Sequence, residues 1–182
     1  MAALPDTLAP AALASVTLTA FLVIVLARAA WHKLDGFLET VGFAQGYGLV
    51  PEAAAAPIVR ALAAAEIAAI IALLVPATRP IGGLVAAGLF AGYGALMAAA
   101  LASGRTRIEC GCGGAPQVVS ALTLARNAVL AALGLAVAVL PVATVPPLGA
   151  AIAIAAALVL AAQYGVAEKL GAHLPHIREG GK

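Results

Sequence analysis

Long apolar stretches follow one another along this chain, and few charged residues interrupt them. Each stretch approaches the roughly 20 apolar residues that an α-helix needs to cross the hydrocarbon core of a bilayer. Only 10% of the 182 residues are charged, and the mean hydropathy of +1.08 is far above that of a soluble globular domain. The sequence therefore predicts an all-α integral membrane protein.

The apolar stretches predict a single transmembrane helical domain over residues 1–182. Several prolines separate the stretches, which suits short turns between membrane helices. We expect a four-helix bundle core and a fifth, C-terminal span, with spans at about 11–30, 58–76, 81–102, 118–140 and 148–165. Residues 31–51 mix charged, aromatic and apolar side chains, which predicts a short interfacial helix after the first span. Residues 168–182 are expected to form a polar, frayed tail.

Small side chains dominate the predicted spans, because alanine is abundant and only 4% of residues are aromatic. Helices of this kind can approach one another closely in lipid. In the third predicted span, Gly88 and Gly92 stand at the GxxxG spacing, which puts both on one helix face. We expect that face to pack against a neighbouring helix rather than to form a dimer.

Charge distribution predicts how the chain is oriented in the membrane. With five spans, all ten Lys and Arg residues except Arg79 fall on or near one side. The positive-inside rule places that side in the cytoplasm. The N-terminus is then periplasmic, and the loop that carries both cysteines is cytoplasmic. The charges are too few and too scattered for nucleic-acid binding.

The two cysteines of the chain, Cys110 and Cys112, stand one residue apart in a polar loop at 103–117. Neighbouring glycines allow a tight backbone, so the two sulfurs can reach each other. A disulfide across one intervening residue closes a small, strained ring, and strain makes a disulfide easier to reduce. Thiol–disulfide exchange is therefore the favoured chemistry.

Other interpretations of the cysteine pair stay open on the residues alone. Arg105 and Arg107 would stabilise a thiolate, whereas Glu109 opposes them. Two thiolates also suit a soft metal such as Cu(I), Zn(II) or Hg(II), although a structural zinc site needs four ligands. A third interpretation is that both cysteines are small, inert, buried residues.

Two further polar residues are candidate site residues. Glu66 lies in the middle of the second predicted span, where a carboxyl group should face the bundle interior. Pairing with an arginine of another span is favoured over a proton-carrying role. Arg126 lies in the second or third turn of the fourth predicted span, where it either anchors the helix at the interface or approaches a thiolate.

A set of these residues resembles the MauE family of methylamine utilisation proteins, and some of them also resemble the broader DoxX-like group of four-helix membrane proteins. The resemblance runs from the first predicted span to the fourth. It rests on Arg28, Lys33-Leu34, Phe37, Tyr47-Gly48-Leu49-Val50-Pro51, Glu66, Arg105, Cys110-Gly111-Cys112-Gly113-Gly114 and Leu124-Ala125-Arg126-Asn127. The chain departs from the family pattern at Gly113, where an aromatic residue is usual.

The resemblance implies a bacterial inner-membrane factor that helps to mature methylamine dehydrogenase, whose disulfide-rich small subunit is periplasmic. It also implies a thioredoxin-like partner of the MauD type. Cys110 and Cys112, with Glu66 and Arg126, would then be the catalytic residues of a thiol–disulfide oxidoreductase component that needs no cofactor, with a quinone left open. A periplasmic client conflicts with a cytoplasmic cysteine loop, which an alternately exposed cysteine pair would resolve. The alternatives are a soft-metal transporter and a structural assembly scaffold.

Overall fold

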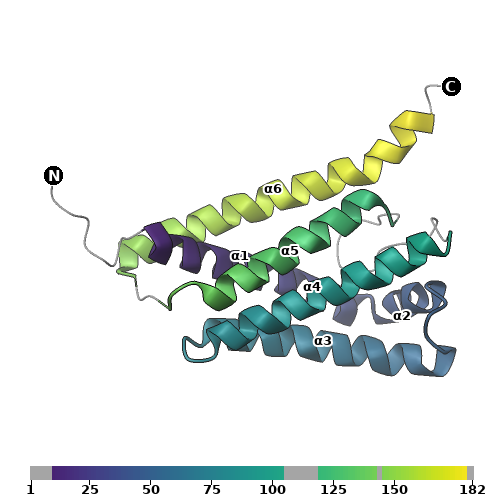
Figure 1. The fold of residues 1–182 in the computed structure, drawn as a ribbon, viewed down its shortest axis with the longest axis horizontal. Coiled ribbons are helices and arrows are strands. Elements are labelled where there is room, and N and C mark those ends of the chain that lie inside the picture. Colours follow the sequence, from purple (N-terminus) through teal and green to yellow (C-terminus); the bar gives the residue numbers. More distant parts are fainter. Residues whose placement is uncertain (1–9, 105–118, 143–144, 180–182) are drawn as a thin grey trace.

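The computed structural model describes the backbone of residues 10–104, 119–142 and 145–179, and their side chains as far as Leu170. Within these residues every regular element is a helix (Figure 1). The six helices are α1 (Pro10–Asp35), α2 (Phe37–Gly46), α3 (Glu52–Leu74), α4 (Arg79–Ala102), α5 (Ala121–Val139) and α6 (Pro147–Glu179).

Five of these helices are long and apolar enough to cross a membrane, and α2 is the exception. The expectation of an all-α, multi-pass membrane protein is thereby confirmed. With ten residues, α2 is only about 15 Å long. It follows α1 in the segment where the sequence predicted an interfacial helix.

The bundle has a four-helix core. α1 packs against α3, α3 against α4, and α4 against α5, while α6 lies along the outside of α1 (Figure 1). The apolar part of α6 is mostly exposed, which suits a helix that faces lipid on most sides. A fifth span therefore joins the bundle at its periphery.

Several helices extend past their predicted ends. α1 continues through Lys33 to Asp35, and α3 begins at Glu52, six residues before the predicted 58. The run of alanines after Glu52 explains the early start, because alanine has the highest helix propensity. α6 continues to Glu179 where a frayed tail was expected. Polar residues end the apolar part of a span, but they do not by themselves end a helix.

α4 and α5 pack closely against each other through a pair of glycines. A Cβ atom added at Gly83 would lie 2.8 Å from backbone atoms of Gly134 and Ala138, and one added at Gly134 would lie 2.8 Å from the nitrogen of Ala87. The two backbones therefore touch directly.

The prediction that Gly88 and Gly92 pack against a neighbouring helix of the chain was wrong. A Cβ atom added at either glycine would meet nothing within 4 Å, and both residues are exposed. The face of α4 that meets α5 carries Gly83 and Ala87 instead. Because Gly88 is one position after Ala87, it is rotated away from that interface.

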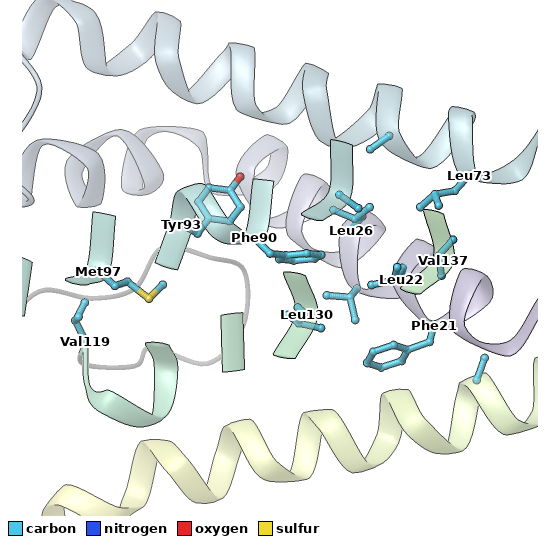
Figure 2. Close-up of a cluster of buried hydrophobic side chains, with 14 of the residues drawn as sticks. Phe21, Leu22, Leu26, Leu73, Phe90, Tyr93, Met97, Val119, Leu130 and Val137 are labelled. Carbon is cyan, nitrogen blue, oxygen red and sulfur yellow. The ribbon is translucent and has the colours of Figure 1, made fainter. Parts of the chain in front are cut away.

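A buried hydrophobic cluster fills the centre of the bundle (Figure 2). Its larger members are Phe21, Leu22 and Leu26 of α1, Leu73 of α3, Phe90, Tyr93 and Met97 of α4, and Leu130 and Val137 of α5. At the end of the bundle opposite α2, Arg79 is buried and donates hydrogen bonds to Ser15 Oγ and to the carbonyl oxygen of Leu140. These contacts tie α1, α4 and the end of α5 together.

Candidate functional site

The predicted catalytic cysteines, Cys110 and Cys112, lie outside the described residues, as do Arg105 and Arg107. The helix ends on either side of that segment are Ala102 of α4 and Ala121 of α5, and they lie at the same end of the bundle as α2 (Figure 1). We call this end the α2 end. Both clusters of charged residues described below lie in the half of the bundle nearer to it.

The first turn of α5 is fixed by a capping box. The hydroxyl oxygen of Ser120 accepts a hydrogen bond from the backbone nitrogen of Thr123 at 3.4 Å, and the Thr123 hydroxyl oxygen accepts one from the Ser120 nitrogen at 2.9 Å. These bonds satisfy backbone groups that a helix start leaves open. The start of α5 is thus well defined, and Arg126 follows in its second turn.

Glu66 lies inside the bundle, where the sequence predicted it. Its Oε1 atom is 2.8 Å from Lys33 Nζ of α1 and accepts a hydrogen bond from the Tyr93 hydroxyl of α4 at 2.7 Å. Glu66 is fully buried and Lys33 is only 2% exposed. Three helices therefore meet at one carboxylate.

The predicted partner of Glu66 was wrong, because it is a lysine and not an arginine. Residues 31–51 read as interfacial in the sequence, but α1 continues through Lys33 and turns its side chain into the bundle. The ammonium group also lies 5.2 Å from the centroid of the Tyr93 ring, which is favourable cation–π geometry. The second carboxylate oxygen, Oε2, is buried without a hydrogen-bond partner in the described part of the chain.

A second charged cluster joins α1, α5 and α6. Glu168 Oε2 is 2.6 Å from Arg28 Nη1, and Glu168 Oε1 is 2.9 Å from Arg126 Nη1. The Glu168 side chain is 2% exposed. Two guanidinium groups therefore contact this one carboxylate.

Sequence reasoning missed Glu168, because it placed that residue in the polar tail. The sequence did contain a signal for this pairing. Glu168 is the first charged residue after Arg126, so no residue between them offers a carboxylate. Arg126 Nη1 donates a hydrogen bond to Glu168 Oε1 at 2.9 Å and so links α5 to α6, while its anchoring role at the membrane interface stays a prediction.

Tyr93 lies between the two charged clusters. Figure 2 shows its hydroxyl pointing out of the hydrophobic cluster, and this group reaches Glu66. Its ring also lines a small cavity together with Arg28, Arg126 and Asn127. Asn127 is buried and donates a hydrogen bond to the carbonyl oxygen of Thr123 at 2.9 Å. The polar groups thus form a band across the bundle from α3 to α6.

Among the described residues, no three His, Cys, Asp or Glu side chains gather where they could hold a metal ion. The described polar groups of the band form ion pairs and hydrogen bonds. Such groups can fix helices relative to one another, and they can stabilise a negative charge near the α2 end.

Comparison with known proteins identifies relatives over most of the chain. The family model described as "Methylamine utilisation protein MauE" matches residues 11–141, from α1 to the end of α5, and leaves α6 outside the match. No solved structure matches the chain significantly.

Four curated relatives found by the comparison carry the name Methylamine utilization protein MauE. The one from Methylophilus methylotrophus is 40% identical over 126 residues, which are 69% of this chain and 65% of that protein. The one from Methylorubrum extorquens is 40% identical over 143 residues and 76% of each chain. The one from Paracoccus versutus is 37% identical over 129 residues and 69% of each chain. With a family match over residues 11–141 on a five-span helical bundle, the chain belongs to the MauE family of methylamine utilisation proteins.

Proposed function

We propose that this protein exchanges thiol and disulfide equivalents in the membrane during methylamine utilisation, and that Cys110 and Cys112 are the exchanging pair. The client would be the small subunit of methylamine dehydrogenase, and the partner a thioredoxin-like protein of the MauD type. Family membership supports the setting, and the family match includes both cysteines. The observation that carries the proposal is the pair of guanidinium groups, Arg28 and Arg126, held on Glu168 toward the α2 end, where the helices flanking the cysteines end.

These two guanidinium groups bear on the reactivity proposed for the cysteines. A thiolate is the attacking form in disulfide exchange, and nearby cationic groups favour it over the thiol. Arg28 and Arg126 both contact the carboxylate of Glu168, at 2.6 Å and 2.9 Å, in the half of the bundle nearer to the α2 end. We assign Arg126 a positioning role through this charge, and Glu66 the role of holding α1, α3 and α4 together.

The exchange step balances without a cofactor. A thiolate of the pair attacks one sulfur of the partner's disulfide, so that a mixed disulfide forms as the partner's S–S bond breaks. The second cysteine then attacks the mixed disulfide and releases the partner as a dithiol. Two electrons pass from the cysteine pair to the partner, and the two thiol protons end on the partner's sulfurs.

The test is the double variant Cys110→Ser/Cys112→Ser in a host that grows on methylamine. We expect the small subunit to lose its correct disulfides while the variant stays in the membrane at normal abundance. The readout is the redox state of the subunit by gel shift after alkylation. Ala102→Ser, an exposed change near the end of α4, is the matched control and should have no effect.

Other outcomes separate the alternative functions. Normal subunit disulfides in the double variant would contradict the proposal and favour a structural scaffold. Normal disulfides together with altered tolerance to mercury or copper would instead favour soft-metal transport.

A further inference from the structure

A pocket with one charged residue in its lining opens between α2, α3 and α4. It holds about 610 Å³ of empty space when its open mouth is counted. Its lining is almost entirely apolar, with Phe43, Tyr47 and Tyr93 as the aromatic side chains. Lys33, one member of the buried Lys33–Glu66 pair, also lies in its wall. We call it the Lys33 pocket. Two of its lining residues, Leu49 and Leu96, are exposed apolar residues.

Lys33 gives the pocket a hydrogen-bond donor. An ammonium group has three N–H bonds. One is directed to Glu66 Oε1 at 2.8 Å and a weaker one to the carbonyl oxygen of Ala29 at 3.4 Å. The third has no acceptor among the described residues, and a ligand oxygen in the pocket could take it.

The net charge at the pocket wall determines which kind of ligand oxygen can accept this hydrogen bond. Lys33 and Glu66 form a buried ion pair of zero net charge. An anionic head group would bring an uncompensated charge into this apolar space, at a large desolvation cost. A neutral carbonyl oxygen needs no counter-charge and accepts one hydrogen bond. The pocket therefore favours a neutral carbonyl compound.

A second hollow continues from the Lys33 pocket along the lipid-facing side of α3 and α4. The two share Leu62, Tyr93 and Leu96 in their linings. The second is an open groove that also runs past Gly88 and Gly92. Because these glycines lack side chains and have nothing within 4 Å of an added Cβ, they leave room for a long apolar tail.

We propose that the Lys33 pocket and the adjoining groove bind a molecule from the bilayer that has a neutral carbonyl head and a long apolar tail. The carbonyl oxygen accepts the third hydrogen bond of Lys33, and the tail lies over Gly88 and Gly92. Two kinds of bilayer molecule have this chemistry, an isoprenoid quinone and an uncharged glycerolipid ester. The site stands on the described geometry alone and does not depend on the exchange function of the cysteines.

The test uses the full chain in lipid nanodiscs and a benzoquinone whose alkyl tail carries a photoreactive diazirine. We expect saturable cross-linking to peptides of α3 and α4. Gly92→Leu should fill the groove and weaken labelling about tenfold or more. The double variant Lys33→Met/Glu66→Leu should weaken labelling by a similar factor, because it removes the hydrogen-bond donor without leaving an unpaired charge. Gly165→Leu is the matched control, because that glycine also has open space around it and lies on α6 outside both hollows.

Competitors identify the source of the ligand. Excess unlabelled quinone that displaces the probe where diacylglycerol does not would identify a quinone site, and displacement by diacylglycerol would identify a glycerolipid site. Displacement by a plain alkane at equal concentration would overturn the proposal, since the carbonyl would then play no part. Absent saturation, or unchanged labelling in both variants, would also overturn it. Labelling should persist in Cys110→Ser/Cys112→Ser, which separates this site from the exchange function.

Discussion

At the scale of single residues, the pairing of Lys33 with Glu66 governs the stability of the bundle centre. Replacing one member of a buried ion pair leaves an uncompensated charge and costs about 3–5 kcal/mol. We therefore expect Glu66→Gln to lower the thermal stability of the purified protein in detergent strongly. The double variant Lys33→Met/Glu66→Leu should lie closer to the wild type, because apolar residues of similar size can replace a buried pair at little cost.

The control for this prediction is Glu52→Gln at the exposed start of α3. It removes the same charge from the same helix and should change stability by less than about 0.5 kcal/mol. A Glu66→Gln protein as stable as the wild type would mean that the Lys33 ammonium finds another partner.

Arg126 carries a second prediction at the residue scale, which rests on the proposed exchange chemistry. Arg126→Gln removes one of the two cations that share Glu168, and the loss of positive charge should raise the pKa of the reactive thiol. The rate of alkylation at neutral pH should then fall, and its pH profile should move to higher pH. Lys169→Gln removes an exposed charge beside Glu168 and should leave the profile in place. Identical profiles for the two variants would remove Arg126 from the proposed mechanism.

At the scale of helices, the contact between α4 and α5 depends on two glycines. Gly83→Ala places a Cβ atom 2.8 Å from the backbone of α5, so the helices must separate. Overpacking of this kind costs about 1–3 kcal/mol. We expect a lower unfolding temperature in detergent for Gly83→Ala and for Gly134→Ala. Gly88→Ala and Gly92→Ala should be neutral or slightly stabilising, because their surroundings are open and alanine favours a helix.

Some features of the helices could be predicted from the sequence and others could not. The spans were predictable, because lipid requires long apolar helices and the hydropathy pattern records that requirement. The partner of Glu66 was not predictable, because the extent of α1 decides whether Lys33 reaches the interior. The seam of α4 was not predictable either, since Gly83 and Gly88 look alike in sequence and only helix rotation distinguishes them. Glu168 needed the knowledge that α6 continues beyond its apolar part.

At the scale of the whole molecule, five spans place the two ends of the bundle on opposite sides of the membrane. α2 and the helix ends that flank the cysteine segment share one side, and the turn between α3 and α4 lies on the other (Figure 1). Arg79 is the one Lys or Arg residue that the sequence places on that other side, and it is buried and donates hydrogen bonds to Ser15 and Leu140. Because these contacts give Arg79 a structural role, its position does not weigh against the positive-inside rule. The distribution of the other Lys and Arg residues then predicts that the α2 end faces the cytoplasm.

This orientation can be measured with single cysteines introduced into the Cys110→Ser/Cys112→Ser background. Gln45 of α2 and Ala77 of the turn between α3 and α4 are both exposed. A membrane-impermeant maleimide should label Ala77→Cys in intact cells and Gln45→Cys only after permeabilisation. The reverse pattern would place the α2 end, and with it the cysteine segment, in the periplasm beside the proposed client. Labelling of both from the same side would contradict the five-span topology itself, because α3 alone separates the two positions by one crossing.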